Sequence, residues 1–432
     1  MAPQPSLNPL KEAESALLKN ESVTLASVPD GFDALVLADL ARALARSGEG
    51  RAVLLVMVAR DGRRQVELEA GLSFAAPDIE VLSFPNWDCQ PYDRASPNAG
   101  IIARRMNVLA RLTVARAGEA KPRILIATAN GVAQRVPPRA RVALDSLAIA
   151  PGNVVDTQTL AAWLENNGFT RASTVRETGD YAVRGGIVDL YAPGMPMPVR
   201  LDFFGDTVES IRSFDAETQR TIGQMRALEL VPMSEIQLTT EAIKRFRQNY
   251  VEQFGAAQRD DLLYEAVSEG RRPPGLEHWL PFFYEHLDTL FDYVDGVPVL
   301  LDARVEEATT QRLAQVKDSY EARVVAMKTP QPGVPPYKPV KPDALYLTPD
   351  EIAAAFGAGA VARLTPFAEA SSTGRKVIDL GARAGRNFAA ERARHDEKAD
   401  EGNVFDAVTE HVRALQEKGK RVIVAAWSEG AR

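Results

Sequence analysis

Cysteine is almost absent from this sequence, since Cys89 is the only one among 432 residues. A single thiol cannot form an internal disulfide, and without clustered partner ligands it gives no metal-binding motif. This composition is typical of a chain that works in a reducing, cytosolic setting. We expect Cys89 to be inert, because no histidine lies near it in the sequence to activate a thiolate.

Histidine is also scarce, with four residues in the chain. His278 and His286 lie in the segment EHWLPFFYEH, eight residues apart and with no third ligand nearby, so we expect them to be structural. His395 and His411 lie in polar helical contexts and carry no motif. The sequence therefore predicts no metal and no catalytic histidine in this chain.

Long apolar runs are missing as well. No segment approaches the roughly 20 apolar residues of a membrane span, and the first residues lack the basic region and apolar stretch of a signal peptide. The sequence predicts a chain with no membrane contact, located in the cytoplasm. Its net charge of −7 does not fit a protein whose whole surface binds nucleic acid.

Basic residues nevertheless cluster in one stretch, residues 101–141. It holds nine lysines or arginines against one acidic residue, Glu119: Arg104, Arg105, Arg111, Arg116, Lys121, Arg123, Arg135, Arg139 and Arg141. A solvated helix face followed by a loop would explain this charge. The alternative is a nucleic-acid-binding module, with Trp87 and Tyr92 nearby as stacking surfaces.

Hydrophobic residues make up 45% of the chain and occur along its whole length, which exceeds what one core usually supports. Residues 1–142 alternate helical patterns with continuous apolar runs such as RAVLLVMVA and RILIATA. Such runs are typical of strands buried on both faces, so this region predicts a parallel α/β sheet. Residues 143–232 change to one amphipathic helix and short strands with turn signals, which predict a compact α+β domain.

Helical patterns return in residues 233–329, ending in a long charged helix. Residues 330–342 then place six prolines in 13 positions, which predicts an extended linker or strap. Residues 343–432 predict a small α/β domain. Because the chain stops four residues after Ser428, a good helix cap without a helix to follow, we expect a fragment of a longer polypeptide.

The first strand-to-helix turn, SVPDGFDALVLADL, lies where a phosphate-binding loop would lie. Such a loop needs two glycines, a lysine and a Ser or Thr, but the corresponding residues here are Ser27, Phe32, Asp33 and Ala34. Asp33 places a negative charge near the position of the lysine, at a cost of several kcal/mol per close charge pair. We therefore expect a degenerate nucleotide loop that binds no ATP, and a chain that is not itself an enzyme.

The segment PVRLDFFGDTVESIRSFD raises a different question. Side chains alternate between the two faces of a strand, so Phe204 should share a face with Arg200 and Asp202, opposite the face of Val199, Leu201 and Phe203. An outward phenylalanine beside an arginine suggests a binding partner, because arginine and aromatic side chains are the usual anchors of protein interfaces.

Several of these segments resemble one family. FPNWDCQPYDRASPN, the stretch GDYAVRGGIVDLYAPGMPMPVRLDFFGDTVESIRSFDAETQRTI and PPGLEHWLPFFYEHLDTLFDYV are similar to the N-terminal part of bacterial transcription-repair coupling factor, Mfd. The pair RGGIVDLY and RLDFFGD is otherwise shared mainly with the excision-repair protein UvrB. The resemblance implies a vestigial helicase-type (RecA-like) parallel-sheet domain in two segments, with the α+β domain inserted between them and a small α/β domain after them.

The resemblance also implies a function. In that family the inserted domain docks onto UvrA and recruits it to RNA polymerase stalled at DNA damage, in transcription-coupled nucleotide excision repair. The resemblance implies that the family's UvrA-contacting positions correspond here to Arg184 in YAVRGG and to Arg200 and Phe204 in VRLDFF. Contacts with RNA polymerase and DNA, ATP and Mg as cofactors, and a C-terminal regulatory domain that masks the UvrA surface would all belong to parts beyond residue 432. We expect this chain to be a monomer that binds UvrA without that mask.

Overall fold

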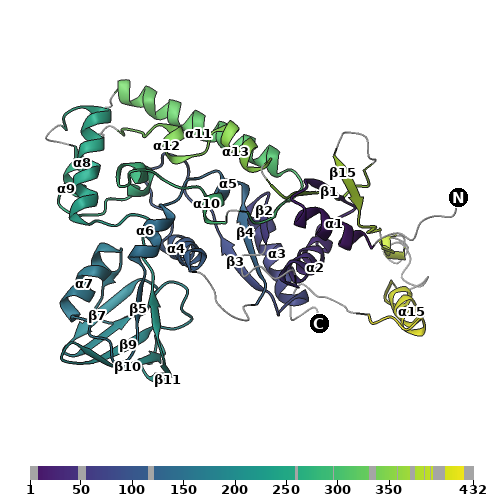
Figure 1. Cartoon of the computed structure of the whole chain (residues 1–432), viewed down its shortest axis with the longest axis horizontal. Coiled ribbons are helices and arrows are strands. Elements are labelled where there is room, and N and C mark those ends of the chain that lie inside the picture. Colours follow the sequence, from purple (N-terminus) through teal and green to yellow (C-terminus); the bar gives the residue numbers. More distant parts are fainter. Residues whose placement is uncertain are drawn as a thin grey trace. The chain divides into compact units, whose positions relative to one another are not determined.

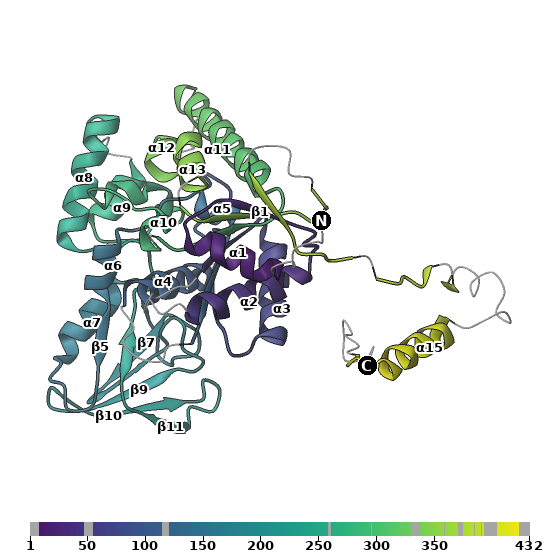
Figure 2. The ribbon, with the colours of Figure 1, turned by 45° about the vertical axis from the view of Figure 1, so that its right-hand side comes forward.

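The computed structural model describes residues 8–422 except for 47–54, 115–120, 258–260, 295, 330–336, 358, 370–374, 384, 390 and 393–403. It divides into two units, residues 1–381 and 382–432. Figures 1 and 2 show the ribbon from two sides. In the described part of the chain no helix is long and apolar enough to cross a membrane.

The core of the first unit is a parallel sheet of seven strands in the order β15-β1-β14-β13-β2-β4-β3. Their bounds are β1 Val23–Ala26, β2 Leu55–Ala59, β3 Glu80–Phe84, β4 Arg123–Thr128, β13 Val299–Leu301, β14 Val361–Leu364 and β15 Lys376–Asp379. Both faces are buried: in β2, Val56 and Val58 pack into one core while Leu55 and Met57 pack into the other. This double burial explains the continuous apolar runs in the sequence.

Helices cover the two faces of this sheet (Figure 2). One face carries α1 Pro9–Leu18, α2 Phe32–Arg46 and α3 Gly62–Ala75. The other carries α4 Ala99–Thr113, α5 Ala129–Val132, α6 Arg139–Asp145, α11 Val305–Lys328, α12 Pro342–Leu345 and α13 Pro349–Ala355. The core sheet thus takes strands from before and after residues 147–230, which form the insertion. This arrangement confirms the predicted fold of two segments with an insertion.

The insertion begins and ends in a two-stranded antiparallel ribbon, β5 Leu147–Ile149 with β12 Leu228–Leu230. Between them lie helix α7 Thr157–Asn166 and a six-stranded sheet in the order β11-β10-β9-β8-β7-β6 (Figure 1). Its strands are β6 Thr170–Arg171, β7 Asp180–Arg184, β8 Ile187–Leu190, β9 Val199–Phe204, β10 Thr207–Phe214 and β11 Thr221–Met225. All neighbours are antiparallel except β6 and β7.

A helical lobe follows the insertion, with α8 Thr240–Phe254, α9 Leu262–Ser268, the 3-10 helix Leu276–Phe282 and α10 Leu290–Tyr293. Aromatic rings hold it together: Phe246 of α8 stacks on Phe283 with centroids 5.0 Å apart and contacts Phe282 at 6.0 Å. Tyr250, one turn further along α8, donates from its hydroxyl to Asp261 at 2.5 Å. The aromatic side chains of this lobe are therefore part of the hydrophobic core.

The predicted small domain at 343–432 needs a correction. Its first part belongs to the core unit, because β14 lies between β1 and β13 and β15 pairs with β1. The prolines predict a local break in regular structure, but local composition carries no information about which distant strand the chain rejoins. Of that segment, residues 330–336 lie outside the described residues, whereas Tyr337 and Val340 are buried in the core.

The described residues of the second unit include the helix α15 Val404–Glu417. Phe388 contacts the helix through the ring of His411, with centroids 5.8 Å apart. Ser428, the predicted helix cap, lies outside the described residues.

Candidate functional site

The outward face of the six-stranded sheet, meaning the face opposite α7, carries the predicted partner-binding residues. Along β9 the burial alternates as predicted: Val199, Leu201 and Phe203 are buried, whereas Arg200 and Asp202 are half-buried and Phe204 is exposed. Phe204 is 81% exposed, the most exposed large hydrophobic side chain among the described residues. It stands at the end of β9, next to the Gly205–Asp206 turn into β10.

Arg184 lies on the same face at the same end of the sheet. It pairs with Ile187 across the β7–β8 turn, and Ile187 pairs in turn with Asp202 on β9. Residues directly opposite each other in a sheet share a face. Arg184 is exposed, and its Nη2 donates to the carbonyl oxygen of Ser173 at 2.8 Å. Arg184 and Phe204 are therefore both accessible.

Arg200 is held differently. Its Nε and Nη2 donate to the two carboxylate oxygens of Asp189 at 2.6 and 2.8 Å, and its guanidinium lies 4.9 Å from the centre of the Phe214 ring. The Asp189 hydrogen bonds raise the pKa of Arg200. The side chain of Arg200 is 18% exposed and that of Asp189 is 1% exposed. Sequence pattern placed Arg200 on the outward face but could not show that a neighbouring strand supplies a carboxylate to it.

The degenerate nucleotide loop lies at the turn between β1 and α2. Ser27 has a left-handed backbone with φ of +56°, and Phe32 is half-buried at the first position of α2. Asp33 is 2% exposed, and its Oδ1 accepts from the backbone N–H groups of Gly31 at 3.0 Å and Ala34 at 2.8 Å. Backbone amides at a helix N-terminus are the donors that a phosphate would use. Here the carboxylate of Asp33 takes two of them.

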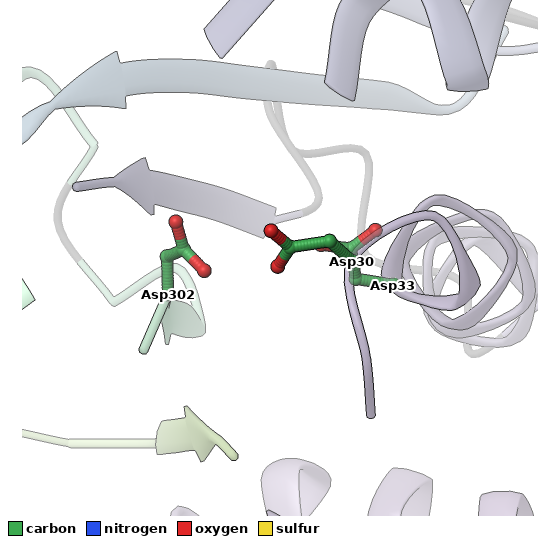
Figure 3. Close-up of side chains that lie close together, drawn as sticks. All are labelled: Asp30, Asp33 and Asp302. Atoms are coloured by element: carbon green, nitrogen blue, oxygen red, sulfur yellow. The ribbon is translucent and has the colours of Figure 1, made fainter. Parts of the chain in front are cut away.

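Three carboxylates gather at this loop. Asp30 and Asp33 come from the turn and the start of α2, whereas Asp302 follows β13 (Figure 3). Burial raises the pKa of Asp33 and of Asp302, and the hydrogen bond from Arg60 lowers that of Asp30.

Two arginines supply the positive charge at this cluster. Arg60 pairs with Asp30 at 2.6 Å and with Asp302 at 3.1 Å, while Arg64 pairs with Asp33. Each of the three carboxylates therefore has an arginine as its ion-pair partner.

Among the histidine and cysteine candidates, His278 is buried and Cys89 is half-buried beside it. His278 is 1% exposed, sits edge-on to Trp87 at 5.5 Å between ring centroids, and has its Nε2 3.9 Å from Sγ of Cys89. Burial raises the pKa of Cys89 to about 12, so its thiolate does not form near neutral pH. His286 is exposed and lies 3.5 Å from Asp288. The structure does not bring the two histidines into one site.

Known proteins show clear similarity to this chain. The family model described as UvrB interaction domain matches residues 147–236, the region that holds the six-stranded sheet. Transcription-repair-coupling factors are similar over most of the chain: that of Haemophilus influenzae is 32% identical over 77% of this chain, and that of Escherichia coli 31% over 72%. The chain matches the N-terminal, UvrB-like region of the transcription-repair-coupling factor family.

The similarity covers about a quarter of those relatives: 27% of the Haemophilus influenzae protein and 26% of the Escherichia coli protein. The transcription-repair-coupling factor of Bacillus subtilis is 28% identical over 54% of this chain and 21% of its own length. The chain thus spans about a quarter of the length of the curated relatives it matches, and the match includes the region of the UvrB interaction domain.

Ion pairs largely neutralise the described part of the basic stretch 101–141. Of its eight described lysines and arginines, five pair with carboxylates: Arg105 with Glu235, Arg111 and Arg123 with Glu80, Arg135 with Glu351, and Arg141 with Asp145. Arg116 lies outside the described residues. Because these arginines pair with carboxylates, and Arg105 and Arg123 are buried, the pairs favour a structural role for the stretch over the nucleic-acid-binding alternative.

One of these pairs fixes the insertion to the core. Arg105 and Glu235 are both fully buried, and Trp87 donates from Nε1 to the other oxygen of Glu235 at 3.1 Å. Glu235 follows β12, where the insertion ends. Sequence reasoning counted Arg105 as surface charge, because no local pattern reveals a carboxylate 130 residues away.

Proposed function

We propose that this chain is a non-catalytic docking module that binds UvrA through the outward face of its six-stranded sheet. The observation that carries the proposal is Phe204, a large aromatic side chain left 81% exposed at the tip of the β9–β10 hairpin. Its location inside the region matched by the UvrB interaction domain supports the same partner. Exposed aromatic and arginine side chains commonly anchor protein interfaces.

The three predicted contact residues have different roles in this proposal. Phe204 and Arg184 make direct contacts, because both are exposed. Nε and Nη2 of Arg200 already donate to Asp189, so Arg200 acts mainly by holding β8 and β9 in register. Only its Nη1 is left as a donor to UvrA. We assign most of the binding free energy to Phe204 and Arg184.

The test is a titration of purified UvrA with this chain and its variants, followed by calorimetry. F204A should weaken binding by about 2 kcal/mol, as loss of a central aromatic anchor does, and R184A by about 1 kcal/mol. Phe74→Ala is the matched control, because Phe74 is 70% exposed on α3 of the core unit. Wild-type affinity in a folded F204A/R184A variant would contradict the proposal.

We also infer that the loop at Ser27–Ala34 holds no nucleotide. Asp33 already accepts from the amides of Gly31 and Ala34, and its own cation is Arg64. A triphosphate would have to displace this carboxylate and face Asp30 and Asp302. Calorimetric titration with ATP and Mg²⁺ should give no heat of binding; micromolar affinity would overturn the inference.

The wider function follows the family. We propose that the whole protein couples UvrA recruitment to stalled RNA polymerase, and that its RNA-polymerase contacts, its DNA translocation driven by ATP hydrolysis and its regulatory domain lie outside this chain. This chain should then bind UvrA at least as tightly as a full-length family member. Weaker binding by this chain would count against a masking domain.

A further inference from the structure

The outward face of the six-stranded sheet, which is the proposed docking face, continues beyond β10 onto the segment 152–155. β11 pairs with the second half of β10, from Ile211 to Phe214. Beside the first half of β10 lies the segment 152–155, where Val155 N–H donates to the Asp206 carbonyl at 2.7 Å and Val208 N–H donates to the Asn153 carbonyl at 2.9 Å. These two bonds form an antiparallel bridge between Val154 and Thr207.

This bridge places Val154 on the same face as Phe204. Thr207 pairs directly with Phe204 on one side and with Val154 on the other, and directly opposed residues share a face. The burial of the neighbours agrees, since Val208 lies in the core beneath the sheet and Val155 packs against it. Phe204, Thr207 and Val154 therefore form one row across three adjacent segments.

Val154 is nearly as exposed as Phe204. It is 77% exposed, against 81% for Phe204. With strands about 4.8 Å apart, the two side chains are separated by roughly 10 Å, a width that one or two apolar side chains of a partner can cover. Two such residues in one row present more apolar surface than the scattered single residues that are normal on proteins.

The charges around this row indicate what the partner presents. Arg200 is neutralised by Asp189, and Arg212 by Asp202 through bonds of 2.9 and 2.7 Å. Arg184, which lies at the same end, has a carbonyl oxygen as its described partner. The face therefore combines an apolar row with the exposed guanidinium of Arg184, for which the described residues show a carbonyl partner and no carboxylate partner.

We propose that Val154 is a further contact residue of the UvrA-docking face, where it pairs with Phe204 to receive an apolar side chain of UvrA flanked by an acidic group that meets Arg184. This inference rests on the proposed function. It adds a segment from outside the six strands to the interface, since Val154 precedes α7 and belongs to none of them.

The experiment compares UvrA affinity of V154A, V154D, F204A and the double variant V154A/F204A in the whole chain. Loss of two buried methyl groups should weaken binding roughly three- to tenfold in V154A, and a buried carboxylate in V154D should weaken it more than about tenfold. Val66→Ala is the matched control, because Val66 is 64% exposed on α3. Circular dichroism and thermal melting confirm that each variant folds.

The outcomes separate the two proposals. If F204A weakens binding while both Val154 variants bind like wild type, the docking face stands and the role of Val154 is refuted. If F204A and R184A also bind like wild type, the proposed function itself fails. Less-than-additive losses in V154A/F204A would support contact with a shared partner side chain; weakening by Val66→Ala equal to that by V154A would refute a specific role.

Discussion

Arg200 and Asp189 show how a single neighbour changes the role of a residue. The sequence places Arg200 outward on a strand, where it looks like an interface arginine. In the structure, Nε and Nη2 of Arg200 donate hydrogen bonds to Asp189, whose side chain is 1% exposed. An ion pair with one deeply buried member contributes to stability mainly because removal of either partner leaves the other uncompensated.

We therefore predict that R200A destabilises the chain. Removing the guanidinium leaves the buried Asp189 carboxylate without a partner, which should lower the free energy of unfolding by roughly 2–4 kcal/mol. Urea denaturation measures this loss. R184A, at an exposed site, should change stability by less than about 0.5 kcal/mol, and D189N should partly rescue R200A. Equal stability of R200A and R184A would contradict this account.

The buried His278 should make the stability of the folded chain depend on pH. Burial lowers its pKa from 6.5 to about 4. Between these pH values the unfolded chain binds the proton and the folded chain does not, so the free energy of unfolding falls as the pH drops from 6.5 to 4, by up to about 3 kcal/mol. Urea denaturation at pH 7 and pH 4.5 should show a smaller difference for H278Q than for wild type.

The exposed His286 provides the control for this measurement. H286Q should keep the pH dependence of the wild type, since His286 lies at the surface beside Asp288. If H278Q and H286Q both behave like wild type between pH 7 and pH 4.5, His278 is not the group that titrates.

Among the elements, the β7–β8 hairpin turn depends on its two glycines. Gly185 has a φ of +56° with open space around it, whereas a Cβ on Gly186 would lie 2.8 Å from the carbonyl oxygen of Phe203. At the same place Phe203 N–H donates to the Gly186 carbonyl at 2.7 Å. The turn needs glycine for conformation at one position and for close backbone approach at the other.

G186A should consequently destabilise the inserted domain. The added methyl group must push β8 away from β9, at a cost of roughly 1–3 kcal/mol in the free energy of unfolding. Gly185→Asn should cost less than about 1 kcal/mol, because asparagine tolerates a left-handed backbone and meets no atom there. Thermal melting of the two variants measures the difference, and a G186A variant that melts with the wild type would refute the close contact.

Element types were largely predictable from the sequence, and their partners were not. Apolar runs predicted β2 and β4, and alternation predicted which side chains of β9 are buried, because these patterns depend on residues close together in the chain. The roles of Arg105 and Val154 could not be predicted in this way. Arg105 pairs with Glu235, and Val154 lies beside Thr207, so each depends on a residue far along the chain.

For the whole molecule, the decisive element is β14. It lies between β1 and β13, so it connects the N-terminal strand to the rest of the core sheet. β15 pairs with the other edge of β1. The strands β14 and β15, which follow the proline-rich segment, are therefore part of the core sheet and not of an appended domain.

This topology predicts the effect of shortening the chain. A chain that ends at Gly381 keeps all seven strands and should melt cooperatively at a temperature close to that of the whole chain. A chain that ends at Thr329 loses both neighbours of β1, so α1 and α2 lose their support and the protein should be largely insoluble or melt much earlier. Soluble, wild-type-like melting of the shorter chain would contradict this arrangement.

The sequence alone determined the local features of this protein: the strands that are buried on both faces, the outward position of Phe204, the poor match of the Ser27–Ala34 turn to a phosphate loop, and the resemblance to one family. The tertiary structure decided which strands are neighbours, which arginines carry free charge and which residue lies beside Phe204. The physical reason is range. Periodicity and backbone preference act within a few residues, whereas parallel pairing and buried ion pairs join residues tens to hundreds of positions apart, and only the folded chain brings those together.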